Sequence, residues 1–105
     1  LALDEAGSIA AALDAHRPWL VINAAGWVRV DDAEDEEAAC HAANASGAID
    51  LARLWSEREI PTVNFSSDLV FDGRDAPYVE GDLPSPLNAY GRSKAAMEEG
   101  IAELD

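Results

Sequence analysis

The chain has 105 residues, of which 49% are hydrophobic, enough for one domain with a modest core. Its 21 acidic and 7 basic residues give a formal net charge of -14, which argues against binding to nucleic acid or anionic membranes, since both need a basic patch. No apolar run reaches the roughly 20 residues of a membrane span and no signal peptide is visible, so we predict a cytoplasmic protein. The single cysteine, Cys40, excludes an internal disulfide and a multi-cysteine zinc site, and we expect it to be a buried structural thiol.

Both ends of the chain indicate a piece of a longer protein. The first residue is Leu1 rather than Met, and Asp105 falls inside a helical pattern. We therefore expect further sequence on either side.

The first predicted helix is capped by Asp4 and runs to about His16, where Pro18 ends the pattern. Its apolar spacing is set by Ile9, Ala12, Leu13 and His16. The apolar run from Trp19 to Asn23 then predicts a short strand covered on both faces, as in a parallel sheet. Three small residues follow at once, which indicates either a tight turn or a place where the backbone approaches a ligand closely: Ala24, Ala25 and Gly26.

Acidic residues dominate the start of the next predicted helix, from Asp31 to Glu37. The helix macrodipole favours acidic side chains in a first turn, so we interpret this run as a solvated helix start and predict no metal site. The helix is expected to reach about Arg58. Asn44 lies off its predicted buried face and is either an exposed filler or a residue with a special role. That face comprises Ala38, Ala42, Ala45, Ile49 and Ala52.

The second predicted strand starts at Ile60 and Pro61 and leads to Ser66, Ser67 and Asp68 at its carboxyl end. A loop over residues 72–87 follows, and loops of this length inside a compact domain are usually functional. The carboxyl end of a buried strand is where open α/β sheets bind their ligands, so we expect a site here.

A last helix is predicted after Asn88, which can cap it. Tyr90 and Lys94 are four residues apart, so a helix places them on one face, one turn from each other. The order helix, strand, helix, strand, helix implies right-handed crossovers and parallel strands. The fold class is therefore α/β, part of a doubly wound parallel sheet.

Together, Ser67, Tyr90 and Lys94 provide the parts of a carbonyl reduction site. A free phenol has a pKa of about 10, and an ammonium group one turn away is expected to lower it toward the working pH. The Ser67 hydroxyl can hold the substrate oxygen while Tyr90 gives it a proton. No side chain can deliver a hydride, so a nicotinamide cofactor, NADP or NAD, is predicted.

Several motifs follow one another along the chain: Asn23-Ala-Ala-Gly, Val30-Asp31-Asp-Ala-Glu34, Asn44, Ser66-Ser-Asp-Leu-Val-Phe-Asp-Gly73, Pro77-Tyr78, Pro86-Leu-Asn-Ala-Tyr90 and Gly91-Arg-Ser-Lys94. In this order they resemble the extended short-chain dehydrogenase/reductases, and within them the dTDP-4-dehydrorhamnose reductase (RmlD) family. The resemblance covers nearly the whole chain, and the segment from Ser66 to Lys94 is specific to that subfamily.

The resemblance implies a Rossmann-like NAD(P)-binding domain, of which residues 1–105 are the central part. It implies reduction of the 4-keto group of a dTDP-linked 6-deoxyhexose with NADPH or NADH, in dTDP-L-rhamnose synthesis. The partner is then a nucleotide-sugar substrate, with a homodimer as one option for the oligomeric state.

The resemblance also implies roles for single residues. Tyr90 is the proton donor, Lys94 binds the nicotinamide ribose and tunes Tyr90, and Ser67 takes the place of the family's Thr or Ser. Asn44 matches an asparagine that supports the active site in much of the superfamily. The remaining implied contacts are to the cofactor, from Ala24, Ala25, Gly26 and Ser66, and to the substrate, from Val30, Ser67, Asp68 and Leu69.

Two departures from the family pattern stand out. Leu69 occupies a position where the family usually has Tyr, which removes one polar contact to the substrate. The chain also has no Gly-rich phosphate turn and no carboxyl-terminal substrate region, so we do not expect these 105 residues alone to convert substrate.

Two alternatives to the reductase share much of the motif set. A non-catalytic regulatory subunit, like the methionine adenosyltransferase β subunit, has the same Ser-Ser-Asp and Tyr-x-x-x-Lys pattern. A sugar-nucleotide epimerase or dehydratase shares the triad, but the segments Phe71-Asp-Gly and Pro86-Leu-Asn count against it.

Overall fold

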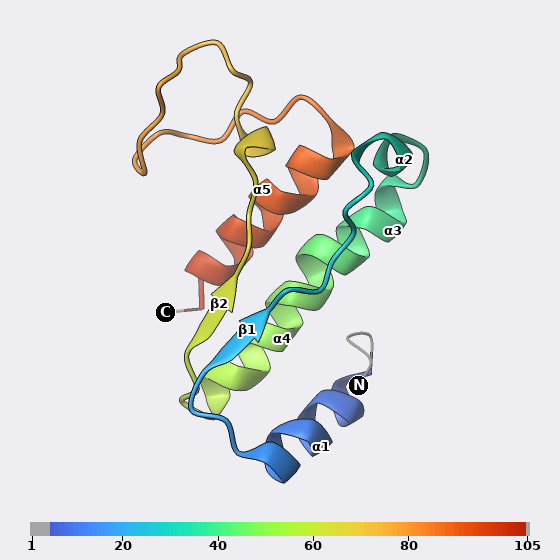
Figure 1. The fold of residues 1–105 in the computed structure, drawn as a ribbon, viewed down its shortest axis with the longest axis vertical. Coiled ribbons are helices and arrows are strands. Elements are labelled where there is room, and N and C mark those ends of the chain that lie inside the picture. The colour runs from blue at the N-terminus through green and yellow to red at the C-terminus, as the bar shows by residue number, and fades with distance from the viewer. Residues whose placement is uncertain (1–4, 105) are drawn as a thin grey trace.

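A small parallel sheet and five α-helices form the fold in the computed structural model, which describes residues 5–104 (Figure 1). β1 and β2 pair in parallel, with Val21 opposite Thr62 and Asn23 opposite Asn64. The predicted α/β class and the parallel sheet are therefore confirmed. In chain order the elements are α1 (Ala6–His16), β1 (Val21–Asn23), α2 (Val30–Asp35), α3 (Glu37–His41), the π-helical turn η1 (Ala42–Ser46), α4 (Gly47–Glu57), β2 (Thr62–Asn64), the 3-10 turn η2 (Asp68–Val70) and α5 (Ala89–Ala102).

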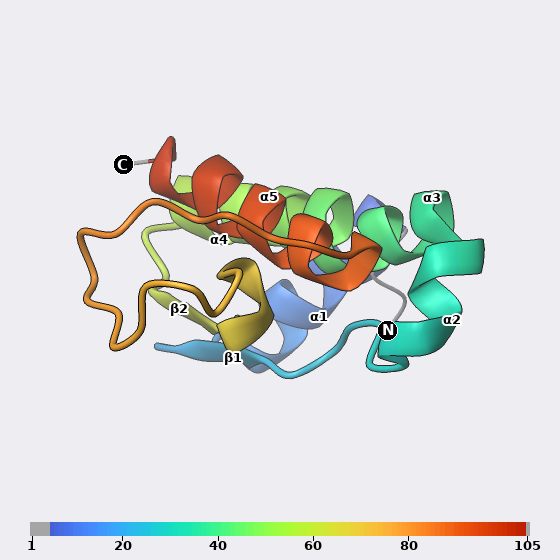
Figure 2. The same ribbon diagram turned by 90° about the horizontal axis from the view of Figure 1, so that it is seen from above.

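One face of the sheet is covered and the other is open. Figure 2 shows α4 and α5 side by side over the same face of the two strands. On the opposite face Ile22 is 59% exposed and Phe65 is 54% exposed. The prediction that the first strand is covered on both faces is therefore wrong for this chain, because α4 and α5 pack on one face only.

The core lies between the helices and on the covered face of the sheet. Ile9 and Leu13 of α1 pack against Leu51 and Trp55 of α4. A second cluster, joining η1, α4 and α5, comprises Ala45, Ala48 and Met97. A third, joining α2, α3 and the start of α5, comprises Ala33, Cys40 and Ala89. The prediction that Cys40 is buried is confirmed, since its exposed fraction is 0%.

The long helix predicted to follow the acidic run is divided. Glu36, with φ of -129° and ψ of 46°, separates α2 from α3, and η1 then inserts a π-helical turn before α4. A π turn adds a residue to the helical repeat and so rotates the side chains on either side of it relative to each other. As a result Ala38 and Ala42 are exposed rather than buried, whereas Asn44 faces the interior.

The predicted helix ends also need correction. Glu5 occupies the position before α1, and the predicted cap Asp4 lies outside the described residues. α5 ends at Ala102, before the end of the helical pattern that was predicted to include Asp105, a residue that also lies outside the description. Within residues 5–104, no helix combines the length and apolar character needed to cross a membrane.

Candidate functional site

Two asparagines mark the carboxyl ends of the strands. Asn23 and Asn64 are register partners, and the Asn23 Nδ2 donates a hydrogen bond to the Asn64 Oδ1 over 3.1 Å. The Asn23 Oδ1 accepts from the backbone N–H of Ala25 over 3.1 Å. The turn that follows β1 is therefore fixed directly above the end of the sheet.

Asn44 fixes the next part of that loop. Its Oδ1 accepts from the Trp27 N–H over 2.7 Å, and its Nδ2 donates to the Trp27 carbonyl oxygen over 3.2 Å. A Cβ at Gly26 would lie 2.7 Å from the Asn44 Oδ1, so only glycine allows this close approach. With 1% of its surface exposed, Asn44 is no exposed filler, and the interpretation as a residue with a special role is the correct one.

The first turns of α5 carry the predicted tyrosine and lysine. Asn88 caps the helix as predicted, because its Oδ1 accepts from the Gly91 N–H over 2.7 Å. The Lys94 Nζ lies 6.0 Å from the centre of the Tyr90 ring and donates to the Phe65 carbonyl oxygen over 2.9 Å. The ammonium group thereby joins the face of α5 that carries Tyr90 to the residue that follows β2.

Burial governs the ionisation of both groups. It raises the pKa of the Tyr90 phenol, and Cys40 and Asp68 add to this electrostatically. Burial likewise lowers the pKa of Lys94. The predicted lowering of the phenol pKa by Lys94 is thus wrong for this structure, because burial and the charges of Cys40 and Asp68 all raise this pKa, and the ammonium group is bound to the Phe65 carbonyl oxygen.

A cavity of about 290 Å³ lies between the loop after β1, the end of β2 and α5. It brings together seven of the predicted site residues: Ala24, Ala25, Gly26, Asn44, Ser66, Tyr90 and Lys94. The other four, Val30, Ser67, Asp68 and Leu69, do not line it. The implied cofactor contacts are therefore gathered in one cavity, and the implied substrate contacts lie outside it.

Ser67 caps η2 with its hydroxyl group. The Oγ accepts from the Leu69 N–H over 3.1 Å and lies 3.3 Å from Asp68 Oδ1, to which it donates. Packing of η2 against α5 is close, since a Cβ at Gly91 would collide with the Leu69 carbonyl oxygen. Ser67 is thus held beside the first turn of α5, the turn that also carries Tyr90.

A buried polar cluster beneath Tyr90 was not predicted. The Ser93 Oγ donates to the Tyr90 carbonyl oxygen over 2.6 Å and accepts from the Asn44 Nδ2 over 3.1 Å. The Cys40 Sγ lies 3.5 Å from the same hydroxyl. These bonds link the loop that Asn44 holds to the turn that carries Tyr90, but the residues are far apart in sequence and no local signal predicts the contact.

Glu98 is another residue near the cavity that was not predicted, although its spacing in the sequence could have indicated it. Its carboxylate accepts a hydrogen bond from the Ser66 hydroxyl. Glu98 is four residues after Lys94, so the spacing that places Tyr90 and Lys94 on one helix face also places Glu98 there.

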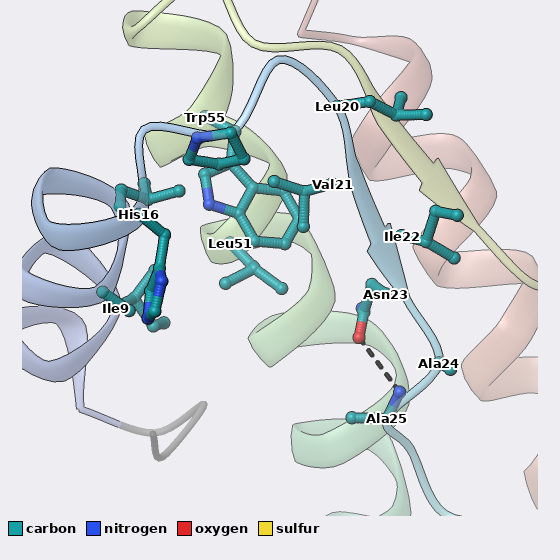
Figure 3. Close-up of a pocket in the computed structure, with 13 residues that line it drawn as sticks. Ile9, His16, Leu20, Val21, Ile22, Asn23, Ala24, Ala25, Leu51 and Trp55 are labelled. Carbon is teal, nitrogen blue, oxygen red and sulfur yellow. Dashed lines mark hydrogen bonds between the residues drawn. The ribbon is translucent and has the colours of Figure 1, made fainter.

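A second hollow, of about 370 Å³, lies on the other side of β1 between α1 and α4 (Figure 3). Its walls are mainly apolar and include Ile9, Leu13, Leu51 and Trp55. It shares Asn23, Ala24 and Ala25 with the cavity at Tyr90, but the described residues that line it include no acidic side chain, lysine or arginine. The candidate site is therefore the smaller cavity, where the ionisable groups converge.

The whole chain, residues 1–105, matches the family described as the RmlD substrate binding domain. The chain belongs to this family. A curated relative, the dTDP-4-keto-6-deoxy-D-glucose reductase of Streptomyces niveus, is 43% identical over 98 residues, which make up 92% of this chain and 34% of the relative.

Solved structures agree with this assignment to the RmlD family. The dTDP-4-dehydrorhamnose reductase of Bacillus anthracis, solved in complex with NADP, superposes with a TM-score of 0.93 at 32% identity and covers 99% of this chain and 38% of its own. The Bordetella bronchiseptica enzyme WbmG, solved with NAD and UDP, has a TM-score of 0.87 at 25% identity and covers 100% of this chain and 34% of its own. The chain therefore spans about a third of the length of its relatives and has their Rossmann-like architecture.

Proposed function

We propose that the protein carrying this chain reduces the 4-keto group of a dTDP-linked 6-deoxyhexose with NADPH or NADH, in dTDP-L-rhamnose synthesis. The observation that carries the proposal is the shared cavity, in which Tyr90 and Lys94 face the small residues from Ala24 to Gly26. Relatives named as reductases of such sugars, at up to 43% identity among those compared, support the same reaction.

The cavity fits the nicotinamide end of the cofactor. Ala24, Ala25 and Gly26 leave room along one wall, and Gly26 stands where a Cβ would collide with Asn44. Lys94 and Ser66 offer polar groups on the opposite side, suited to ribose hydroxyls. When bound there, a nicotinamide cofactor supplies the hydride.

In this mechanism Tyr90 gives a proton to the substrate oxygen. Its raised pKa keeps the phenol protonated at neutral pH, which is the form that a reduction needs. Ser67 holds the substrate oxygen. For this its hydroxyl gives up the hydrogen bond that it donates to Asp68 Oδ1 and donates one to the substrate oxygen instead. Asp68, Val30 and Leu69 contact the nucleotide sugar next to the cavity.

The proposal also covers the place of this chain in the whole protein and the compartment in which it works. Residues 1–105 form the central part of the NAD(P)-binding domain, which agrees with a chain that spans about a third of its relatives. A free thiol at Cys40 agrees with a reducing, cytoplasmic compartment.

The direct test is NADPH oxidation by the full gene product with a dTDP-4-keto-6-deoxyhexose, followed by cofactor absorbance and analysis of the sugar. We expect one cofactor oxidised for each 4-hydroxyl formed. Sugar conversion without net cofactor oxidation would instead indicate an epimerase or dehydratase. Cofactor binding without any turnover would favour the regulatory subunit.

Replacing Asp68 by Asn is expected to change the pH dependence of this reaction. The Asp68 charge helps raise the pKa of Tyr90, so its removal lowers that pKa. Reduction needs the protonated phenol, and the alkaline decline of kcat/KM should therefore begin at a lower pH in Asp68→Asn than in the wild type. Asp75→Asn, in the loop over residues 72–87, is the control. If kcat/KM declined at the same alkaline pH in the wild type, Asp68→Asn and Asp75→Asn, the assignment of this decline to Tyr90 would be contradicted.

A further inference from the structure

The first turn of α5 rests on α2, whose acidic residues were predicted only to form a solvated helix start. Ala33 of α2 and Ala89 of α5 have exposed fractions of 0% and 1% and belong to one apolar cluster. Two alanines in contact let the helices approach closely enough for side chains of α2 to reach the backbone of α5.

Glu34 makes that contact. Its Oε1 accepts a hydrogen bond from the backbone N–H of Ala89 over 2.6 Å, across a separation of 55 residues. The first N–H groups of a helix have no partner within it, and the positive end of the macrodipole favours a carboxylate there. Asn88 accepts from the N–H of Gly91, so separate side chains bind the amides on either side of Tyr90.

An ion pair joins the neighbouring helix α3 to α5 as well. The Arg92 Nε lies 3.0 Å from Glu37 Oε1, and both side chains are about half exposed. Exposed pairs of this kind contribute little, typically 0 to about 1 kcal/mol. The bond from Ala89 to Glu34 is shorter, ends on a buried residue and adjoins Tyr90, so it has the greater influence on where the phenol lies.

We propose that Glu34 is a positioning residue that holds the first turn of α5, and with it Tyr90, by accepting the hydrogen bond from the Ala89 N–H. This inference rests on the proposed reductase function. A proton donor must be aligned with the substrate oxygen, and a displacement of about 1 Å in an active site can cost on the order of a hundredfold in rate. Glu34 acts through Ala89 and does not itself touch the substrate.

The experiment compares Glu34→Ala, Glu34→Gln and the control Glu36→Gln in the full gene product. Among the described residues, the Glu36 carboxylate has no hydrogen bond or ion pair, so Glu36→Gln makes the same chemical change without breaking a contact. Amide hydrogen exchange over residues 88–92 measures how firmly the first turn of α5 is held, and it does not require an active enzyme. Steady-state kinetics measure how well Tyr90 is aligned for proton donation.

In Glu34→Ala we expect exchange over residues 88–92 to accelerate about tenfold and kcat to fall about ten- to a hundredfold, with the KM for NADPH unchanged. Glu34→Gln retains an oxygen acceptor and should recover most of both losses, and Glu36→Gln should match the wild type. Unchanged exchange in Glu34→Ala, or a kcat equal to that of Glu36→Gln, would overturn the proposal. A wild-type protein without reductase activity would instead count against the proposed function, and the exchange result would still show whether Glu34 holds the turn.

Discussion

Replacing Tyr90 by Phe is expected to lower kcat for reduction by about a hundredfold or more, the usual range for loss of a positioned general acid being about 10²–10⁴. The variant removes only the hydroxyl group. The ring of Tyr90 packs against the cluster of Ala33, Cys40 and Ala89, and phenylalanine retains that packing. Its effect should therefore appear in kcat, with cofactor affinity and the free energy of unfolding close to those of the wild type.

Tyr78→Phe provides the matched control. The Tyr78 hydroxyl donates to Asp72 Oδ1 over 3.1 Å in the long loop, and the ring stacks on Phe71 with centroids 4.1 Å apart. Tyr78 does not line the cavity at Tyr90. Both variants are measured by NADPH oxidation under saturating substrate. Equal kcat values for Tyr90→Phe and wild type would exclude Tyr90 as the proton donor.

Local sequence patterns were enough to predict the elements that carry this site. The apolar runs before Asn23 and after Ile60 mark the two strands, although one face of each strand is open in this chain. The spacing of Tyr90 and Lys94 places both on one helix face, and Asn88 caps that helix as predicted. These features depend on residues near one another in sequence.

The π turn could not be predicted in the same way. A regular helical repeat places Asn44 off the buried face, but η1 shifts the repeat and brings it under the loop at Trp27. The acidic run was likewise interpreted as solvated. One of its carboxylates, that of Glu34, binds the Ala89 N–H 55 residues away, and such a contact depends on the packing of two helices.

The arrangement of the triad was predicted in part. Tyr90 and Lys94 line one cavity, but Ser67 lies outside it, where its hydroxyl bonds within its own turn, and the ammonium group of Lys94 bonds to Phe65. Directions of hydroxyl and ammonium groups depend on backbone oxygens and N–H groups that carry no sequence signal. The pKa of Tyr90 was predicted to fall but rises, because tertiary packing buries the phenol, whereas the place of Tyr90 on α5 was predicted correctly.

Replacing Gly91 by Ala is expected to lower both the stability and the activity of the protein. Alanine is the better helix former by about 1 kcal/mol, so in an exposed helix this change would stabilise. At Gly91, however, the new Cβ would collide with the Leu69 carbonyl oxygen and would lie 3.1 Å from the Asn88 Oδ1 that caps the helix. Overpacking of this kind costs typically about 1–3 kcal/mol, and the colliding atom belongs to the backbone, so it cannot rotate away.

The collision falls between the two parts of the site. Ser67 caps η2, which begins at Asp68, α5 carries Tyr90, and η2 and α5 approach closely at Gly91. Separating them should move Ser67 away from Tyr90 and reduce kcat along with the free energy of unfolding, measured by urea denaturation. Gly81→Ala is the control, because a Cβ there meets no atom within 4 Å. If Gly91→Ala were as stable and active as Gly81→Ala, the close contact between η2 and α5 could not be what aligns the serine with the tyrosine.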